Sequence, residues 1–256
     1  MDIDKFTDWD PANDREADNL TPTANSRIRR DLMGLYTEPP PGIFAVGDET
    51  NLKFVYALII GPMGTPYEGG FFYFMLKCPN DYPLQPPKVK FLTTDGGKCR
   101  FNPNLYKNGK VCISILGTWT GPAWSPAQQL TSLLVTIQSL LTEKPFFNEP
   151  GVKENTPGDA SRYSDIVTYN TLKIAVCGMV DNECHLHIPS RLKEIIKKSF
   201  CNYYEQYMHI IDEKMHLDGY VYMDPFSMEK VIFNYKALKA RFQAIHARIS
   251  SQMNTT

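Results

Sequence analysis

Apolar residues recur at helical spacing in the first strongly patterned stretch of the chain. Ile28, Leu32 and Leu35 would share one face of a helix, with arginines elsewhere on the cylinder. Asn25 and Ser26 directly precede this pattern, and either side chain is suited to capping a helix start. We therefore predict a helix that begins at one of these two residues and ends at the segment EPPPG.

Four short runs rich in aromatic and β-branched residues follow this helix. They are IFAV, LKFVYALIIGP, GFFYFMLKCP and PKVKFLTT, and glycine, proline, asparagine and aspartate separate them at short intervals. Each run is typical of a β-strand, and the turn residues between them favour direct connections. The pattern predicts an antiparallel meander.

Helical periodicity returns after a long irregular segment, residues 95–126. A segment of this length inside a compact domain usually means either function or a wrong assignment of elements, and this one contains Cys112. Near its end, Ser125 is placed to cap a second helix. The apolar positions of that helix are Leu130, Leu133, Leu134, Ile137, Leu140 and Leu141. A helix, a meander, a long loop and a second helix predict an α+β fold.

The two ends of the chain differ from its middle. Residues 1–24 are acidic and polar, so we predict a disordered tail there. Residues 25–180 are interpreted as one domain and residues 181–256 as a helical extension. Two amphipathic helices are expected in that extension, packed on each other or on the domain. Their apolar positions are Leu192, Ile195, Ile196, Phe200, Tyr203, Tyr207, Ile210 and Ile211, then Leu238, Phe242, Ile245 and Ile249.

Composition and charge narrow the function classes. The 256 residues are 43% hydrophobic, which suffices for a sizeable core. Lysine and arginine number 27 against 28 aspartates and glutamates, so no strong field attracts nucleic acid or anionic lipid. The N-terminal stretch has no signal-peptide pattern, and no apolar run approaches membrane-spanning length. We expect a soluble protein of the cytoplasm and nucleus without nucleic-acid or membrane partners.

Six cysteines, at positions 78, 99, 112, 177, 184 and 201, include no CxxC pair and are expected to be free thiols. Cys177, Cys184, His185 and His187 are close in sequence but match no common zinc spacing. We therefore predict no metal site.

Cys112 raises a chemical question, because no histidine precedes His185 in the chain. A hydrolase cysteine is normally activated by a nearby imidazole. Flanked by Val111 and Ile113, such a cysteine is by itself most often a buried core thiol. Its surroundings change that interpretation.

Four motifs around Cys112 together resemble the ubiquitin-conjugating enzymes. They are YEGGFFYFMLKCPNDYPLQPPKVKF, NPN, NGKVCISIL and WSPA, and their order and spacing fit the family as well as their residue types. The resemblance runs from about Ser26 to Val180. It implies the fold of that family and a thioester-transfer activity.

The resemblance also implies roles for individual residues. Cys112 would accept the C-terminal carboxyl of ubiquitin or a ubiquitin-like protein from an activating enzyme, then pass it to a lysine or a ligase. The incoming thioester is already activated, so no catalytic triad is needed. Asn104, eight positions before Cys112, would stabilise the oxyanion. Asn102 replaces the histidine of the family's His-Pro-Asn motif and would brace the loop. Trp119 to Ala123 lengthen the following segment and should change the rim of the site.

Further positions match the family's gate and partner surfaces. Asn148 and Glu149 in EKPFFNEPG match the gate that orients the incoming lysine. Three arginines of the first helix match the face for the activating enzyme, and two loop tips match the ligase contacts. These residues are Arg27, Arg29 and Arg30 for the activating enzyme and Leu84, Pro126 and Ala127 for the ligase.

The resemblance implies a set of partners but no cofactor, because ATP is used by the upstream activating enzyme. The partners are ubiquitin, an activating enzyme and ligases. A branch of the family with a similar GTWTGPAWSPAQ insertion and a long C-terminal region further implies the less common ubiquitin-activating enzyme and a tandem ubiquitin-like modifier. We expect the protein to act as a monomer.

Two alternatives stay open at this point. The chain could be an inactive module that binds ubiquitin-like proteins, although inactive variants of this fold lack the cysteine. It could also be a thiol hydrolase that borrows His185 or His187, although both follow a complete predicted domain and carry no protease signature.

Overall fold

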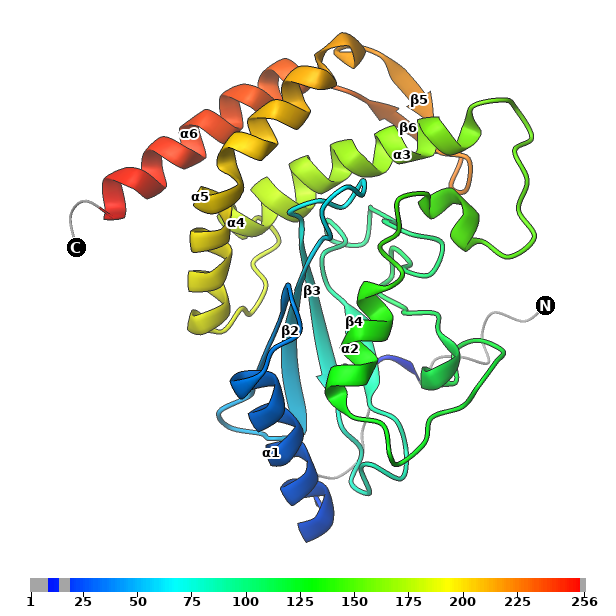
Figure 1. The fold of residues 1–256 in the computed structure, drawn as a ribbon, viewed down its shortest axis with the longest axis vertical. Helices are drawn as coiled ribbons and strands as arrows, with labels where there is room; N and C mark the ends of the chain where they lie inside the picture. The colour runs from blue at the N-terminus through cyan, green and yellow to red at the C-terminus, as the bar shows by residue number, and fades with distance from the viewer. Residues whose placement is uncertain (1–8, 14–18, 254–256) are drawn as a thin grey trace. The chain divides into compact units, whose positions relative to one another are not determined.

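The computed structural model describes residues 9–13 and 19–253, which form two compact units (Figure 1). The first unit contains the described residues up to Ile60 and the segment Phe72–Leu140. The second contains Gly61–Phe71 and the described residues from Leu141 onward. The predicted boundary at residues 180 and 181 therefore falls inside the second unit and does not separate the two.

Helix α1 (Pro22–Thr37) opens the first unit. Its N-cap is Thr21, whose Oγ1 accepts a hydrogen bond from the backbone N–H of Ala24 (3.1 Å). Pro22 occupies the first helical turn, where its fixed φ fits and its missing N–H costs nothing. The predicted start at Asn25 or Ser26 is wrong, because the Thr-Pro pair provides an earlier cap.

The predicted disordered tail, residues 1–24, also needs correction where the structure describes it. Pro22–Ala24 are helical, and the carboxylate of Asp10 lies 2.6 Å from Nζ of Lys90. An ion pair to the sheet and the buried Pro11 show that residues 9–13 contact the folded unit. Residues 1–8 and 14–18 lie outside the described residues.

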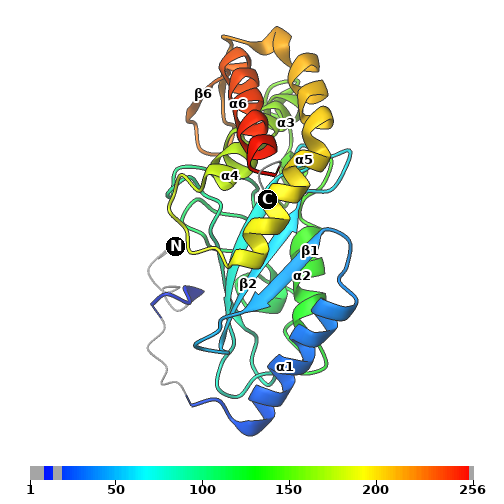
Figure 2. The same cartoon turned by 90° about the vertical axis from the view of Figure 1, so that its left-hand side faces the viewer.

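The sheet of the first unit has four antiparallel strands in the order β1-β2-β3-β4. Helices α1 and α2 pack on β1 and β2 and on each other (Figure 2). The predicted meander and the α+β class are confirmed. The elements are β1 (Ile43–Gly47), β2 (Phe54–Ile60), β3 (Phe71–Lys77), β4 (Lys88–Phe91) and α2 (Leu130–Gln138).

Aromatic rings fill the core beside this sheet, as the phenylalanine-rich strands suggest. Four buried rings contact one another with centroid separations between 5.1 and 6.3 Å, a range in which edge and tilted packing are favourable. They belong to Phe72, Phe74, Phe91 and Phe101. Because Phe101 comes from the long irregular segment, the core anchors the start of the predicted catalytic loop.

The N-cap of helix α2 lies four residues after the predicted capping site, Ser125. Gln129 is its N-cap and forms a capping box with Ser132, in which each side chain bonds to the other residue's backbone. Ser125 instead belongs to the preceding turn, where its N–H donates to Oε1 of Gln128 (2.9 Å). The prediction that Ser125 caps α2 is therefore wrong, since residues 125–128 form a turn of their own.

The second unit is mainly helical. The two predicted helices of the extension are present as α5 and α6, but the structure adds several elements that the sequence analysis missed. Among the helices that the structure describes, none is long and apolar enough to cross a membrane. The elements are α3 (Asp159–Asn170), the π-helix η4 (Thr171–Gly178), α4 (Met179–Asp181), α5 (Ser190–Glu213), β5 (Val221–Met223), β6 (Lys230–Ile232) and α6 (Tyr235–Met253).

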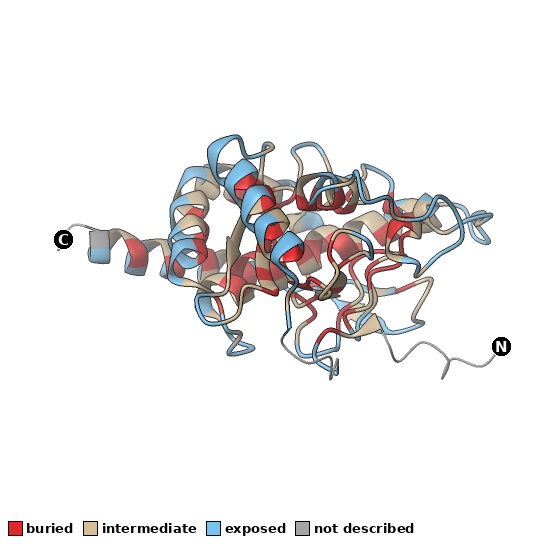
Figure 3. Cartoon of the chain, turned by 90° about the horizontal axis from the view of Figure 1, so that it is seen from below, coloured by how far each residue is buried: buried red, intermediate tan, exposed pale blue. Residues whose placement is uncertain are grey.

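Helices α5 and α6 pack against each other, one of the two arrangements expected (Figure 2). The Phe242 ring of α6 lies 5.8 Å from the Phe200 ring and 5.2 Å from the Tyr207 ring of α5. Buried positions run along one side of the helices and exposed positions along the other (Figure 3). The apolar stripes of the sequence therefore form the core of this unit.

Tyr207 also anchors the segment that connects β2 to β3. Its buried hydroxyl donates to the carbonyl of Gly69 (2.8 Å). Gly69 has φ +69°, and a Cβ there would lie 2.6 Å from Cε1 of Tyr207. Only glycine combines this backbone conformation with so close an approach.

Gly69→Ala is therefore expected to lower the free energy of unfolding by about 2–5 kcal/mol, from backbone strain and overpacking together. The matched control is Gly64→Ala, because Gly64 has φ +74° but nothing within 4 Å of its added Cβ. The control should lose only about 1–2 kcal/mol, the cost of the backbone conformation. Urea titration followed by circular dichroism measures both variants. Equal losses would show that Tyr207 can move aside.

Candidate active site

The loop that carries Cys112 is tied to the edge of the sheet. The N–H of Phe91 donates to the carbonyl of Gly109 (2.8 Å), and Lys110 forms a β-bridge with Lys90. Gly109 has φ +92°, and a Cβ there would lie 2.7 Å from the carbonyl oxygen of Phe91. The Asn108-Gly109 turn signal thus returns the chain to strand β4 just before Cys112.

Cys112 is held through its main chain and its side chain. Its N–H donates to the carbonyl of Asn104 (2.9 Å), while its Sγ lies 3.1 Å from the carbonyl oxygen of Thr118. The residue is only 4% exposed. The thiol is therefore covered by the turn that follows the short helix η2 (Ser114–Leu116).

Thr118 fixes that turn through its hydroxyl. Oγ1 lies within hydrogen-bond distance of the carbonyls of Val111 (2.7 Å) and Ile113 (3.0 Å), and it accepts from the N–H of Ile113 (3.0 Å). The Thr118 hydroxyl thus contacts the backbone of the residue before Cys112 and of the residue after it. The sequence motifs did not single out Thr118, although the neighbouring residues Trp119 to Ala123 were predicted to change the rim of the site.

Asn104 contacts Cys112 reciprocally. Its Nδ2 donates to the carbonyl of Cys112 (2.8 Å), and its own carbonyl accepts from the Cys112 N–H. In this geometry the side-chain amide of Asn104 supports the main chain of the cysteine itself. The two residues predicted to act together are therefore neighbours in space.

Asn102 is fully buried and bridges two segments. Its Oδ1 accepts from the N–H of Asn104, and its Nδ2 donates to the carbonyl of Leu140; both distances are 2.9 Å. Arg100 adds hydrogen bonds to the carbonyls of Asn102 (3.2 Å) and Pro103 (2.6 Å). An amide that both accepts and donates can thus occupy the position of the family's histidine without leaving an unpaired polar atom.

Burial makes several other cysteines poor nucleophiles. It raises the pKa of the Cys177 thiol to about 12 and raises the pKa values of Cys78 and Cys201 as well. Since the thiolate is the reactive form, these side chains have little of it at neutral pH. Among the described residues, which include Cys177, Cys184, His185 and His187, no three His, Cys, Asp or Glu side chains are grouped so that they could hold a metal ion.

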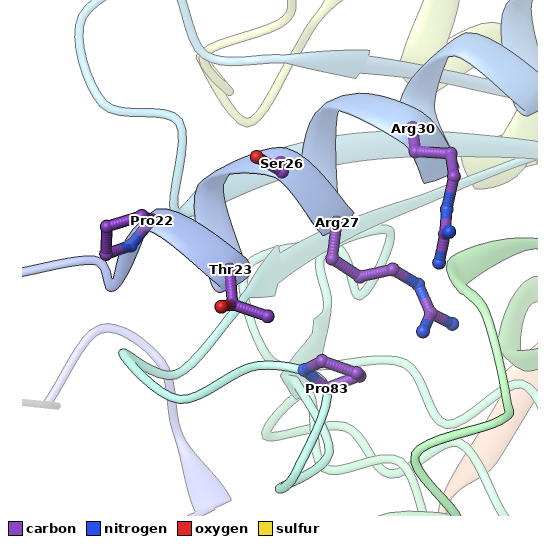
Figure 4. Close-up of a pocket in the computed structure, with 6 residues that line it drawn as sticks. All are labelled: Pro22, Thr23, Ser26, Arg27, Arg30 and Pro83. Carbon is purple, nitrogen blue, oxygen red and sulfur yellow. The ribbon is translucent and has the colours of Figure 1, made fainter.

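The predicted surface for the activating enzyme contains one arginine with an internal role. Arg27 is 10% exposed at its side chain and pairs with Asp31 (2.8 Å). Its guanidinium also donates to the carbonyls of Pro126 and Gln128. Figure 4 shows Arg27 beside a pocket of about 550 Å³, with Arg30 one turn further along α1.

Arg29 and Arg30 remain on the exposed side of α1, where Arg29 Nε donates to Oδ1 of Asn25 (2.8 Å). They are therefore the members of the predicted basic face that a partner can reach most directly.

The two predicted ligase-contact tips lie in the same region of the first unit. Leu84 is 67% exposed, and Pro126 and Ala127 are exposed as well. The Trp124 indole joins the tips by donating to the carbonyl of Pro83 (2.8 Å), while Arg27 holds Pro126. The structure thus brings the predicted ligase positions together.

The predicted gate belongs to the second unit. Asn148 ends the short helix η3 (Pro145–Asn148), and its Oδ1 accepts a hydrogen bond from Oγ1 of Thr142 (3.1 Å). Phe146 is buried against Phe226 in the same unit. Glu149 follows directly in an extended conformation. The Asn102, Asn104 and Cys112 group lies in the first unit.

Comparison with known proteins agrees with this fold and this loop. A sequence model described as "Ubiquitin-conjugating enzyme" matches residues 27–164, more than half of the chain. The chain therefore belongs to the ubiquitin-conjugating enzyme family, whose members are transferases that accept ubiquitin as a thioester and pass it on. Membership implies interaction with ubiquitin, an activating enzyme and ligases.

Within the family, the chain is similar to proteins named ubiquitin-conjugating enzyme E2 Z. It is 48% identical to the Xenopus tropicalis protein over 94% of this chain and 77% of that one. Identity to the Danio rerio protein is 47% over 95% of this chain and 74% of that one. Identity to the Homo sapiens protein is 45% over 96% of this chain and 70% of that one. The resemblance inferred from the motifs is thereby confirmed.

Proposed function

We propose that Cys112 is the thiol that carries the modifier. The reciprocal hydrogen bonds between Cys112 and Asn104 are the observation that supports this most strongly, because they build a defined loop around one cysteine. In the first step the Cys112 thiolate attacks the thioester carbonyl of the charged activating enzyme. A new S–C bond forms, the old one breaks, and the activating enzyme's thiolate leaves.

The second step transfers the modifier to an amine. A deprotonated lysine attacks the Cys112 thioester, the N–C bond forms, the S–C bond breaks so that Cys112 leaves as a thiolate, and the proton lost by the amine passes to solvent. Asn104 would swing its Nδ2 from the Cys112 carbonyl to the developing oxyanion. Asn102 would keep the loop in place, and Asn148 and Glu149 would orient the lysine. No resident cofactor takes part in this scheme.

The partners proposed for the chain are ubiquitin and a tandem ubiquitin-like modifier, charged by the less common ubiquitin-activating enzyme. Similarity to the proteins named E2 Z over most of the chain supports this choice. We further propose that the protein acts as a monomer in the cytoplasm and nucleus. The test pairs each activating enzyme with each modifier, ATP and this protein on a non-reducing gel. A reductant-sensitive adduct in only one pairing would identify the preferred route, and none in any pairing would reject the proposal.

The covered thiol leads to a prediction about Thr118. Thr118→Val removes the hydroxyl that ties the turn to Val111 and Ile113, while keeping the shape of the side chain. Loss of about 1 kcal/mol of hydrogen bonding should raise alkylation of Cys112 by N-ethylmaleimide about fivefold. Mass spectrometry of the labelled peptide separates Cys112 from the exposed Cys184.

The control for this experiment is Thr120→Val, an exposed threonine in the same segment. It should leave the alkylation rate of Cys112 unchanged. Equal rates for the Thr118 variant and the wild-type protein would show that the turn opens without breaking the threonine contacts.

We also propose that the C-terminal extension helps to select partners, because it lies beyond the residues assigned to chemistry. Truncation after Val180 is not a suitable test, since it would remove α5 and α6 from a compact unit that also contains α3 and η4. Substitution of the exposed Lys197 and Lys198 on α5 preserves the packing.

Lys197→Glu with Lys198→Glu is expected to change the ratio of charging rates between the two activating enzymes by at least about threefold, the effect of altering contacts at a polar rim. Gel-based charging rates with each activating enzyme measure this ratio. Lys197→Arg with Lys198→Arg keeps the charge and serves as the control. If the ratio of charging rates is unaltered in the glutamate variant, these lysines do not take part in the choice of activating enzyme.

A further inference from the structure

A second site lies within the second unit, in a pocket of about 260 Å³. Its walls come from the Gly61–Phe71 segment, from Glu143, from the continuous stretch of α3 and the start of the π-helix η4, and from the end of α5. None of the residues assigned above to catalysis lines it. Four segments that are separate in the sequence thus converge on one polar hollow.

Two polar side-chain atoms on this pocket's lining residues are buried and have no hydrogen-bond partner among the residues that the structure describes. One is Oε1 of Glu68, whose other oxygen accepts from the N–H of Gly64 (2.8 Å). The other is Oγ1 of Thr171, a residue that is only 1% exposed. Buried polar atoms are nearly always paired, and an unpaired carboxylate oxygen is especially unfavourable. The Glu68 oxygen can only accept, and the Thr171 hydroxyl can accept as well as donate, so a ligand that donates hydrogen bonds would satisfy both.

The charge of the lining residues defines the ligand further. Carboxylates come from Glu68, Glu143 and Asp165, whereas Lys214 is the one cation among the lining residues that the structure describes. Nζ of Lys214 is already paired with Asp165 at 2.7 Å. The lining residues therefore offer no second cation to balance the carboxylates of Glu68 and Glu143. The pocket favours a positively charged hydrogen-bond donor.

We propose that this pocket binds the guanidinium group of an arginine side chain presented by a partner protein. A guanidinium carries five N–H donors in a planar fork, so one group can donate to more than one acceptor, such as the Glu68 carboxylate and the Thr171 hydroxyl. It also keeps its charge when desolvated, which a lysine ammonium does less readily. A free amino acid would bring its own carboxylate toward Glu68 and Glu143, and this favours a side chain of a polypeptide as the source.

The test is an NMR titration of the isotope-labelled 256-residue chain with three small probes. Acetyl-arginine amide mimics a side chain in a polypeptide, acetyl-citrulline amide is its uncharged counterpart, and free L-arginine represents a metabolite. We expect saturable shifts of the Gly64 and Thr171 amide signals with acetyl-arginine amide. Binding of the citrulline compound should be at least tenfold weaker, and free arginine should also bind more weakly.

Each other outcome would overturn part or all of the proposal. Equal binding of the arginine and citrulline compounds would exclude recognition of the charge. Tighter binding of free arginine than of acetyl-arginine amide would show that the ligand is a metabolite and not a side chain of a partner protein. Absence of saturable shifts with all three probes would mean that water alone satisfies Glu68 and Thr171. These comparisons use the wild-type chain, so they do not depend on the folding of any variant.

A substitution then locates the binding group. Glu68→Gln keeps an oxygen that can accept from the Gly64 N–H but removes the negative charge. It should weaken the binding of acetyl-arginine amide at least tenfold. Glu205→Gln, at an exposed position of α5 outside the pocket, is the matched control and should bind like the wild type. Unchanged binding in the Glu68 variant would place the probe elsewhere and reject this site.

Discussion

Cys112→Ala is expected to abolish formation of the thioester, because no other residue can replace the sulfur at the centre of the loop. Cys112→Ser should instead trap a more slowly exchanging oxyester, since a serine oxygen can occupy the same position as the thiol. Both outcomes are measured by incubation with activating enzyme, ATP and modifier on non-reducing gels. The adduct of the serine variant should resist reductant, whereas that of the wild type should not.

Cys184→Ala provides the control, because Cys184 is the exposed thiol of the second unit. Its charging should match the wild type. A full-strength thioester on the Cys112→Ala variant would move the nucleophile to another cysteine. Folding of the alanine variant is checked by its circular dichroism spectrum, since removing a buried thiol leaves only a small cavity.

Much of the fold could be predicted because its elements have clear periodicities. Each of the four β-runs corresponds to one strand of the meander, and most of the apolar positions predicted for α1, α2, α5 and α6 are buried. Helix starts were less predictable, because a cap depends on a local competition between neighbouring residues. Thr21, followed by Pro22, caps α1 in place of Asn25. Gln129, together with Ser132, caps α2 in place of Ser125.

Elements with weak patterns were missed. Strands β5 and β6 have three residues each, too few to show an alternation of apolar and polar positions. They form a two-stranded antiparallel sheet by pairing with each other. The π-helix η4 follows α3 without a break in helical composition, so no residue type marks the change. The grouping of Gly61–Phe71 with the C-terminal helices depends on long-range contacts such as the one between Gly69 and Tyr207.

One contact of the candidate site likewise could not be predicted from a sequence pattern. Asn102, Asn104 and Cys112 were found because their spacing matches a family motif, whereas the contact of Thr118 with the thiol depends on the conformation of an insertion. Whether the three motif residues carry the proposed roles stays a prediction. The family assignment itself rests on several linked motifs, and the comparisons confirm it.

Asp31 illustrates what no local pattern indicates. This buried carboxylate accepts hydrogen bonds from Arg27, from the Tyr82 hydroxyl (2.6 Å) and from the N–H of Leu130 (3.3 Å). Burial and the bond to Asp31 raise the pKa of the Tyr82 phenol, so it stays a donor. One residue thus joins α1, the loop before β4 and the start of α2. Partners of this kind are far apart in sequence, and only the folded chain brings them together.

Asn104→Ala is expected to slow transfer of the modifier to free lysine by roughly 100-fold or more, while charging stays nearly intact. The reason is that an oxyanion donor acts mainly in the transfer step, where the acceptor amine builds up charge on the thioester oxygen. Because Nδ2 also supports the Cys112 carbonyl, loss of the side chain could act through the loop instead. Single-turnover discharge of a pre-charged enzyme measures the transfer step alone.

Two further variants separate the chemical role from the structural one. Asn104→Asp keeps the size and an oxygen but removes the donor, so it should slow discharge as strongly as the alanine variant. Asn108→Ala disturbs the same loop by removing the acceptor for the Lys110 N–H (3.1 Å), and it should leave discharge within about threefold of the wild type, the scale of one exposed hydrogen bond. The alkylation rate of Cys112 reports loop integrity in all three. If Asn104→Ala lowers charging and discharge equally and also alters the alkylation rate, Asn104 holds the loop and does not stabilise the oxyanion.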